Sequence, residues 1–169
     1  MIKKIIIALL ITCNGTKVFS QNEEKAILKQ VQTFMECIVS KDSLTFNKLF
    51  HDGPVAWTGV FRDSTTAKIR FRDKSFSNVF NDTPKNFFRG LMKIERVEEK
   101  FDHIKIVHDG SIALVSFDYT FWMNGQIYNW GSEYWTMIKK DNVWKITSVI
   151  FSMELEMFYP YQKRQLKRE

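Results

Sequence analysis

The stretch that decides the fold is NGQIYNWGSEYWTMI, residues 124–138, which opens on a tight-turn dipeptide and continues as a run of strand-forming residues. Asn-Gly favours a two-residue hairpin turn. Two further turn signals, Asp109-Gly110 and Asp141-Asn142, lie about one strand length before and after it. Sequential strands joined by short turns form an antiparallel meander. The spacing therefore predicts a meander of four strands, at about 95–108, 111–123, 126–140 and 143–153.

The second strand of this meander alternates cleanly between apolar and polar residues. Ser116, Asp118 and Thr120 share one face of the strand, as in a sheet that is buried on one side and wet on the other. The opposite, apolar face carries Ala113, Val115, Phe117, Tyr119 and Phe121.

Helical patterns precede the meander. Ile27, Val31, Phe34 and Ile38 recur at helical spacing, which predicts a first helix from about Glu23 to Ser40, with Asn22 as its N-cap. A short second helix follows to Phe50, then a strand over 55–61. Thr83-Pro84 is a cap followed by proline at the first helical position, which predicts a third helix to about Met92. Residues 62–83 have no clear pattern, although alternation around Ile69 and Phe71 fits a short edge strand.

The first twenty residues have the three-part layout of a secretory signal peptide. Lys3 and Lys4 precede the apolar run 5–11, which is far shorter than the roughly 20 residues that span a bilayer. We therefore predict a signal peptide at 1–20, a domain at 21–155 and a charged tail at 156–169. The product would be periplasmic or secreted, with no stable membrane insertion after processing. Anchoring as a lipoprotein through Cys13 is the alternative.

Composition supports one folded domain and argues against nucleic acid. The chain has 169 residues, of which 44% are hydrophobic, enough for a core. Residues 1–20 carry three lysines and no acid, so removing them lowers the net charge from +6 to +3. A mildly basic domain lacks the electrostatic footprint of a nucleic-acid-binding protein. Cys37 is then the single cysteine, which we expect in the core and not in a disulfide.

The order of helix, helix, strand, helix and meander resembles the nuclear transport factor two-like superfamily, a cone-shaped fold that includes ketosteroid isomerase and polyketide cyclases. The resemblance covers about residues 23–153 and looks closest to the secreted bacterial members of unknown function. The segments that carry it are DGSIALV at 109–115, NGQIYNWGSEYWTMI at 124–138 and VWKI at 143–146. It implies an α+β fold in which N-terminal helices pack in a highly curved antiparallel sheet that forms a cone-shaped pocket.

The resemblance also implies which residues face that pocket. Family patterns put Trp135 inward, and period two then puts Glu133 and Asn129 on the same face. A carboxyl buried among aromatics has a raised pKa, which makes Glu133 the candidate general acid or base. The alternative is a Glu at the wet rim, or one paired with a lysine. The expected ligand-binding residues are Trp57, Phe117, Tyr119, Asn129 and Trp135.

Two departures from the family pattern limit the chemistry. Trp57 lies near the place where the early strand of ketosteroid isomerase supplies its aspartate base, so isomerase chemistry by that route is not supported. Asn129 stands where secreted relatives often carry a histidine. His51, His103 and His108 match no metal motif, and the chain has no nucleotide-binding or hydrolase motif. We expect no metal and no cofactor.

Three functions remain open at this stage. The first is an exported protein that binds a small apolar or amphipathic molecule. The second is an isomerase, dehydratase or cyclase that uses Glu133. The third is a dimeric interaction domain, because Tyr128, Trp130 and Tyr134 would form an aromatic patch on the outer face of the sheet. We expect a homodimer through that face.

Overall fold

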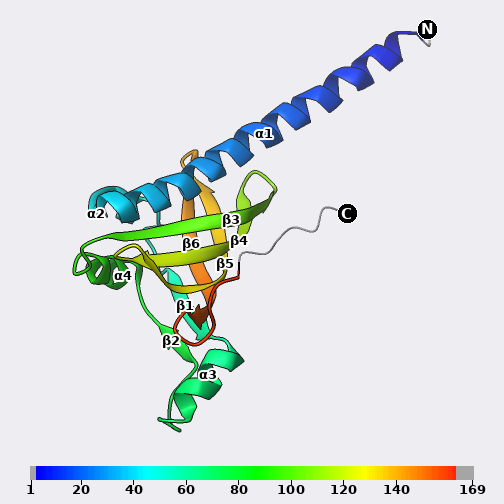
Figure 1. Cartoon of the computed structure of the whole chain (residues 1–169). Coiled ribbons are helices and arrows are strands. Elements are labelled where there is room, and N and C mark those ends of the chain that lie inside the picture. Colours follow the sequence, from blue (N-terminus) through cyan, green and yellow to red (C-terminus); the bar gives the residue numbers. More distant parts are fainter. Residues whose placement is uncertain (1–2, 163–169) are drawn as a thin grey trace.

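The computed structural model describes residues 3–162 and the side chains from Ser20 onward. Helices and strands alternate in the first half of the chain, and the second half is all strand (Figure 1). The elements are α1 (Lys3–Ser40), α2 (Ser43–Lys48), β1 (Ala56–Phe61), α3 (Asp63–Arg70), β2 (Val79–Asn81), α4 (Pro84–Leu91), β3 (Val97–His108), β4 (Ile112–Met123), β5 (Gln126–Lys140) and β6 (Val143–Leu155).

One curled sheet of six strands, in the order β2-β1-β6-β5-β4-β3, makes the frame of the molecule. The predicted meander β3–β6 is confirmed, and its strands pair antiparallel. The strand β1 lies parallel to β6, so the sheet is not antiparallel throughout. The turns are also as predicted: Asn124 and Gly125 have φ of 52° and 84°, and Asp141 and Asn142 have 50° and 63°. Positive φ at both central residues is the geometry of a type I′ hairpin.

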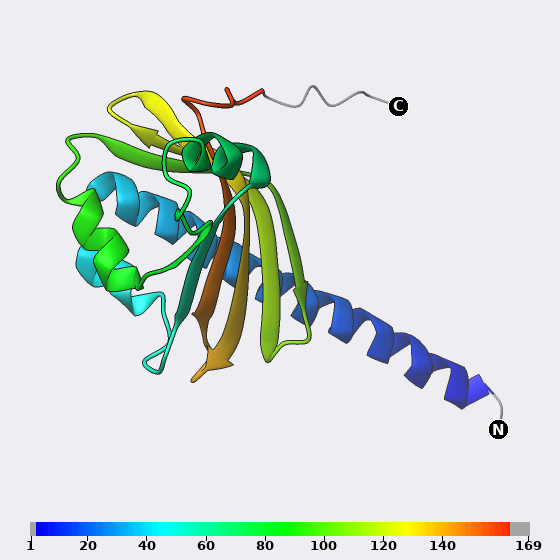
Figure 2. The ribbon, with the colours of Figure 1, turned by 90° about the horizontal axis from the view of Figure 1, so that it is seen from below.

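The helix α1 lies across the sheet and supplies the centre of the core (Figures 1 and 2). Ile27, Val31, Phe34 and Ile38 are all buried, as their helical spacing predicts. The helix begins at Lys3, not at Asn22, and it continues through Asn14-Gly15 without a break. Its N-terminal half projects beyond the sheet in both views. Within residues 3–162, no helix is both long and apolar enough to cross a membrane.

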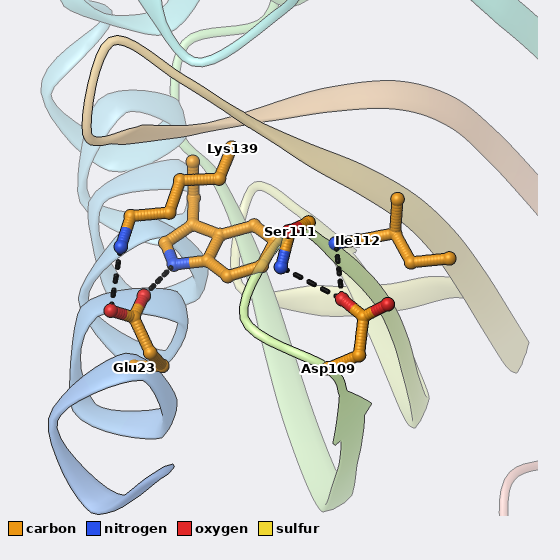
Figure 3. Close-up of polar contacts among 6 residues, drawn as sticks. Glu23, Asp109, Ser111, Ile112 and Lys139 are labelled. Atoms are coloured by element: carbon orange, nitrogen blue, oxygen red, sulfur yellow. Dashed lines mark hydrogen bonds and ion pairs between the residues drawn. The ribbon is translucent and has the colours of Figure 1, made fainter. Parts of the chain in front are cut away.

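A partly buried ion pair fastens α1 to the sheet (Figure 3). The Lys139 ammonium lies 2.6 Å from one Glu23 carboxylate oxygen, and the Trp144 indole N–H donates to the other at 2.9 Å. The hydrogen bond from Lys139 is the main cause that lowers the pKa of Glu23. In the same view, Asp109 accepts the backbone N–H groups of Ser111 and Ile112, which fixes the turn between β3 and β4.

The alternation around Ile69 and Phe71 suggested a short edge strand in segment 62–83, but the structure has no strand at these two residues. Residues 63–70 form α3, and a short strand comes later, at β2. Contacts that are distant in sequence explain the helix: the hydroxyl of Thr65 donates to Glu154 at 2.5 Å and accepts the Leu155 N–H at 3.2 Å. These bonds hold α3 against β6 and place Ile69 beside the cavity described below.

The short helices begin where their caps predict. Asp42 accepts the backbone N–H of Thr45 at the start of α2, and Thr83 accepts that of Asn86 at the start of α4. An N-cap oxygen satisfies one of the first free N–H groups of a helix. Cys37 is buried in the core, as expected. The caps therefore set the entry points from which Phe46 and Phe88 reach the core.

Candidate functional site

A cavity of about 320 Å³ opens between the sheet and the helices. Every strand contributes to its wall, together with α1, α3 and α4. The aromatic part of the wall is Phe34, Trp57, Phe61, Phe80, Phe87, Tyr119, Phe121, Tyr128 and Phe151, and the aliphatic part is Ile69, Met153 and Leu155. The polar part is Asp82, Glu99, Asn129 and Glu133.

The register of the meander brings the polar groups of the wall together. Asn129 pairs with Phe121, and Phe121 pairs in turn with Glu99 on β3. Glu133 lies four residues further along β5, and period two keeps it on the same face as Asn129. The two glutamates therefore approach the cavity from different strands.

Glu133 is a buried carboxyl at the inner end of the cavity, with 4% of its surface exposed. The Trp135 indole N–H donates to its Oε1 at 2.5 Å, from the same face of β5. Burial raises the pKa of Glu133 to about 8, although the hydrogen bond from Trp135 opposes the rise. Desolvation penalises the charged form of a carboxyl, so Glu133 is mostly protonated at neutral pH.

Glu99 is a second buried carboxyl, which the sequence analysis missed. It is 7% exposed and lies on the inward face of β3 between Val97 and Phe101. Burial raises the pKa of Glu99 well above its usual range, and the charge of Glu133 adds to the rise. Two carboxyls that repel each other in a dry site resist ionising together. The signal that could have found Glu99 is its parity with Val97 and Phe101.

Tyr119 faces the cavity, but its hydroxyl already has a partner. The hydroxyl donates to the Ser152 carbonyl at 3.2 Å. Burial is the main cause that raises the pKa of Tyr119 well above its usual range; the charges of Glu133 and Glu99 add to it, and Arg62 opposes it.

The strands β5 and β6 approach closely beside Tyr119. A Cβ on Gly131 of β5 would lie 1.8 Å from the Ser152 oxygen of β6, so glycine is required at this position.

Asn129 brings an unsatisfied acceptor to the cavity. Its side-chain oxygen is buried and has no hydrogen-bond partner within the described residues. A buried polar atom without a partner costs free energy that a bound ligand can recover. Asn129 therefore marks the part of the wall where a polar ligand group would gain most.

The other expected site residues divide between the cavity and the core. Trp57 lines the cavity, and its ring lies 4.8 Å from that of Phe87. Phe117 and Trp135 are buried on the expected face but do not line the cavity. They pack deeper, where Phe101 stacks on Phe117 at 3.9 Å and Phe34 of α1 lies 4.9 Å from Trp135. The two residues were predicted on the correct face of their strands but at the wrong position along them, because α1 fills that end of the cone.

The expected aromatic patch on the outer face is only partly exposed. Tyr134 is 60% exposed on that face, whereas Trp130 is half-buried. Tyr128, which is 52% exposed, lines the cavity and is therefore not confined to the outer patch that parity predicted. The Trp130 indole N–H donates to the Tyr159 carbonyl at 2.9 Å, and the Arg62 guanidinium lies 5.2 Å from its ring centroid. Part of the predicted tail thus covers Trp130; residues 163–169 lie outside the described part of the chain.

The described residues do not provide a set of ligands for a metal ion. Among the described residues, no group of three or more His, Cys, Asp or Glu side chains is placed to hold a metal ion. His103 pairs with Asp118 on the outer face of the sheet, with its Nδ1 3.0 Å from the carboxylate. What the cavity can offer is proton exchange at Glu99 and Glu133, and binding by its aromatic walls.

No protein-family model and no curated protein matches this chain. Solved structures do match. A protein of unknown function from Mycobacterium tuberculosis has a TM-score of 0.59 at 15% identity, over 80% of this chain and 73% of that one. A nuclear transport factor two-like protein with a cystatin-like fold, from Novosphingobium aromaticivorans, has a TM-score of 0.61 at 10% identity, over 84% and 88%. A protein from the same organism, described as the beta subunit of an aromatic-ring-hydroxylating dioxygenase, has a TM-score of 0.60 at 14% identity, over 80% and 91%.

These likenesses establish that the chain has the nuclear transport factor two-like fold, with N-terminal helices and a curled sheet. The resemblance predicted from residues 109–115, 124–138 and 143–146 is confirmed at the level of the fold. At sequence identities of 10–15%, these structures show that the helices and strands are arranged alike, and they do not show the chemistry of the site.

Proposed function

We propose that this protein binds a small, largely apolar molecule in its cavity. The observation that carries the proposal is a hollow of about 320 Å³ whose wall has nine aromatic side chains and only four polar ones. Small-molecule sites are concave, mostly apolar and equipped with a few convergent polar groups. Trp57 and Tyr119 supply aromatic surface, Asn129 and Glu133 supply polar anchors, and Phe117 and Trp135 support the wall from the core.

A neutral fluorescent probe tests the binding directly. The fluorescence of N-phenyl-1-naphthylamine, which is uncharged at neutral pH, should rise when it enters the cavity of the wild-type chain. Asn129→Phe should abolish the rise, because a phenyl ring at that position fills the hollow. Tyr134→Phe, on the outer face, is the matched control and should bind normally. A silent wild-type protein, or unchanged binding in Asn129→Phe, would refute the proposal. Thermal shifts with sterols, polyketides, flavins and quinones then narrow the class of ligand.

Acid–base catalysis in the same cavity is the second candidate. The observation in its favour is that burial raises the pKa of Glu133 to about 8, near the pH at which a general acid or base works best. Glu133 would then move a proton in an isomerase, dehydratase or cyclase reaction. With a substrate in hand, turnover that survives Glu133→Gln unchanged would end this assignment.

Export is part of the proposal. The described contacts between α1 and the sheet begin at Glu23, and Ser20, Gln21 and Asn22 are exposed. Cleavage after Ser20 would therefore leave the ion pair to Lys139 in place, and the domain would act in the periplasm or outside the cell. Mass spectrometry of the protein from an exporting host tests this: a chain that starts near Gln21 supports it, an intact N-terminus refutes it, and lipid on Cys13 would establish the anchored alternative.

A homodimer through the outer face of the sheet remains a proposal as well. Trp130 is covered by the chain itself, so the face that is left consists of Tyr134 with its strand partner Ile150 and of Leu114, all about half exposed or more. Exposed apolar residues in one area favour association. Sedimentation velocity should show a dimer that Tyr134→Glu dissociates, and a monomer at high micromolar concentration would refute it.

A further inference from the structure

The polar groups of the cavity are all of one kind. Glu99, Glu133 and Asp82 bring carboxyls, and Asn129 brings an amide whose unpaired atom is its oxygen. Within the described part of the chain, no lysine, arginine or histidine lines the cavity. The wall therefore offers carboxyl and amide oxygens as hydrogen-bond acceptors, and no cationic side chain of the described residues lies among them.

Asp82 is only half-buried and already accepts the Thr83 backbone N–H, whereas the two glutamates are buried and largely unused. Glu99 is 93% buried, given its 7% exposure, and no described residue donates a hydrogen bond to its carboxyl. Glu133 receives one donor, the Trp135 indole, and its second oxygen is left for another partner. The hydroxyl of Tyr119, which also lines the cavity, already donates to the Ser152 carbonyl. A buried acceptor without a donor is costly, so the cavity is complementary to a ligand that brings donors.

The aromatic walls favour the same kind of ligand. Trp57, Tyr119, Phe121 and Phe151 line the same cavity as the carboxyls. The face of an aromatic ring carries negative charge density and attracts a cation within about 6 Å, most strongly where water is excluded. Rings and carboxyls that line one small hollow form a site for an ammonium group attached to an apolar body.

We propose that the cavity binds a lipophilic amine in its protonated form, with the ammonium between Glu99 and Glu133, one N–H on the Asn129 oxygen, and the apolar body against the aromatic wall. This inference rests on the proposed binding function and names its ligand class. An organic anion would meet three carboxyls and no cation. A neutral ligand would leave the Asn129 oxygen unpaired unless it carried its own donor.

Proton release follows from this arrangement. The titratable groups that face the site are Glu99 from β3, Tyr119 from β4, Glu133 from β5 and Asp82 after β2; α1, α3, α4, β1 and β6 contribute apolar side chains. Arg62 acts on Tyr119 from outside the cavity. Because burial raises the pKa of both carboxyls, Glu99 well above its usual range and Glu133 to about 8, both are protonated in the empty site at pH 7, and Glu133 gives up its proton first. A bound ammonium favours the carboxylate, so that proton leaves, and affinity rises with pH by up to about tenfold per unit between pH 6 and 8.

A matched series of ligands tests the inference on the full chain. The series is 1-naphthylmethylamine, 1-naphthalenemethanol and 1-naphthoic acid, which share one ring system and differ in charge. Each displaces N-phenyl-1-naphthylamine, and calorimetry in phosphate and in Tris counts the protons released. We expect the amine to bind at least about tenfold more tightly than the alcohol at pH 8, and the acid to bind most weakly. At pH 7, where Glu133 is still mostly protonated, only the amine should release close to one proton.

Variants separate the carboxyls from the hollow itself. Glu133→Gln and Glu99→Gln should each weaken the amine and reduce proton release while leaving the alcohol unaffected. Glu98→Gln, on the outward face of β3 where Glu98 pairs with Lys100, should change nothing. An alcohol or acid that binds as well as the amine, or amine binding without proton release in the wild-type chain, overturns this inference and leaves the binding function standing. Failure of the uncharged probe and of the whole series overturns both.

Discussion

The buried carboxyl of Glu133 should make the protein less stable as the pH rises, and Glu133→Gln should remove much of that effect. The pKa of Glu133 is about 8 in the folded chain, against 4.5 for an ordinary glutamate. Each pKa unit corresponds to about 1.4 kcal/mol. Ionising Glu133 therefore costs the folded state about 5 kcal/mol relative to the unfolded chain, a large part of a typical stability of about 5–15 kcal/mol.

The direction of the effect follows from proton counting. Below pH 4.5, Glu133 is protonated in both states and contributes nothing to the pH dependence. Between pH 4.5 and 8, the folded state keeps a proton that the unfolded chain has lost, so the free energy of unfolding falls as the pH rises. From pH 5 to pH 8, the fall that belongs to Glu133 is about 3–4 kcal/mol.

Urea unfolding of the wild type and Glu133→Gln, measured from pH 5 to pH 9, tests this reasoning. Glutamine keeps the size of the side chain, and its carbonyl oxygen can still accept the Trp135 N–H. We expect the two proteins to differ by less than about 1 kcal/mol at pH 5, and the variant to be more stable by about 3 kcal/mol at pH 8. Glu98→Gln is the control. Wild-type and variant stabilities that run parallel with pH would refute the buried, protonated state of Glu133.

Three further substitutions test how the fold around the site is held. Gly131→Ala should lower the free energy of unfolding in urea by about 2 kcal/mol or more, because its Cβ would meet the Ser152 oxygen. Gly90→Ala, which has open space around it, should raise that free energy slightly, and equal effects of the two variants would contradict the close approach at Gly131. Glu23→Gln should destabilise at pH 7, and the gap should close as the pH falls below about 4.5, because the Glu23 pKa is lowered in the folded state; a constant gap would contradict the ion pair. Thr83→Ala should cost about 1 kcal/mol by thermal unfolding, and no loss would contradict the cap.

The meander and the inward face of β5 could be predicted because their signals are local. Turn dipeptides such as Asn124-Gly125 carry their own geometry, and strict alternation assigns faces without knowledge of the partner strand. The same parity placed Glu133 and Trp135 on one face, where the indole N–H now meets the carboxylate.

Glu99 was missed because its neighbours hide the alternation. Glu98, Glu99 and Lys100 are three charged residues in a row, and only the buried Val97 and the half-buried Phe101 indicate which of them points inward. A local pattern cannot show that β3 lies beside β4 in a register that sets Glu99 opposite Phe121.

The sequence pattern also could not predict how far along a strand a residue lies from the cavity, or which distant segments of the chain are in contact. Alternation gave Phe117 and Trp135 the correct face, but it could not show that Trp135 packs against Phe34 of α1, whose ring itself lines the hollow. Residues 63–70 form a helix because Thr65 bonds to a glutamate 89 positions further on. Trp130 is covered because the chain returns over it after β6.

The proposed binding mode depends on a carboxyl that is buried and still lines the hollow, so the ionisation of Glu133 in the free protein is its sharpest test. Side-chain carboxyl ¹³C shifts, followed from pH 3 to pH 10 and assigned with Glu133→Gln, give its pKa. We expect a titration near pH 8 that moves to lower pH when 1-naphthylmethylamine is bound. A Glu133 signal that titrates near 4.5, with or without the amine, would contradict it.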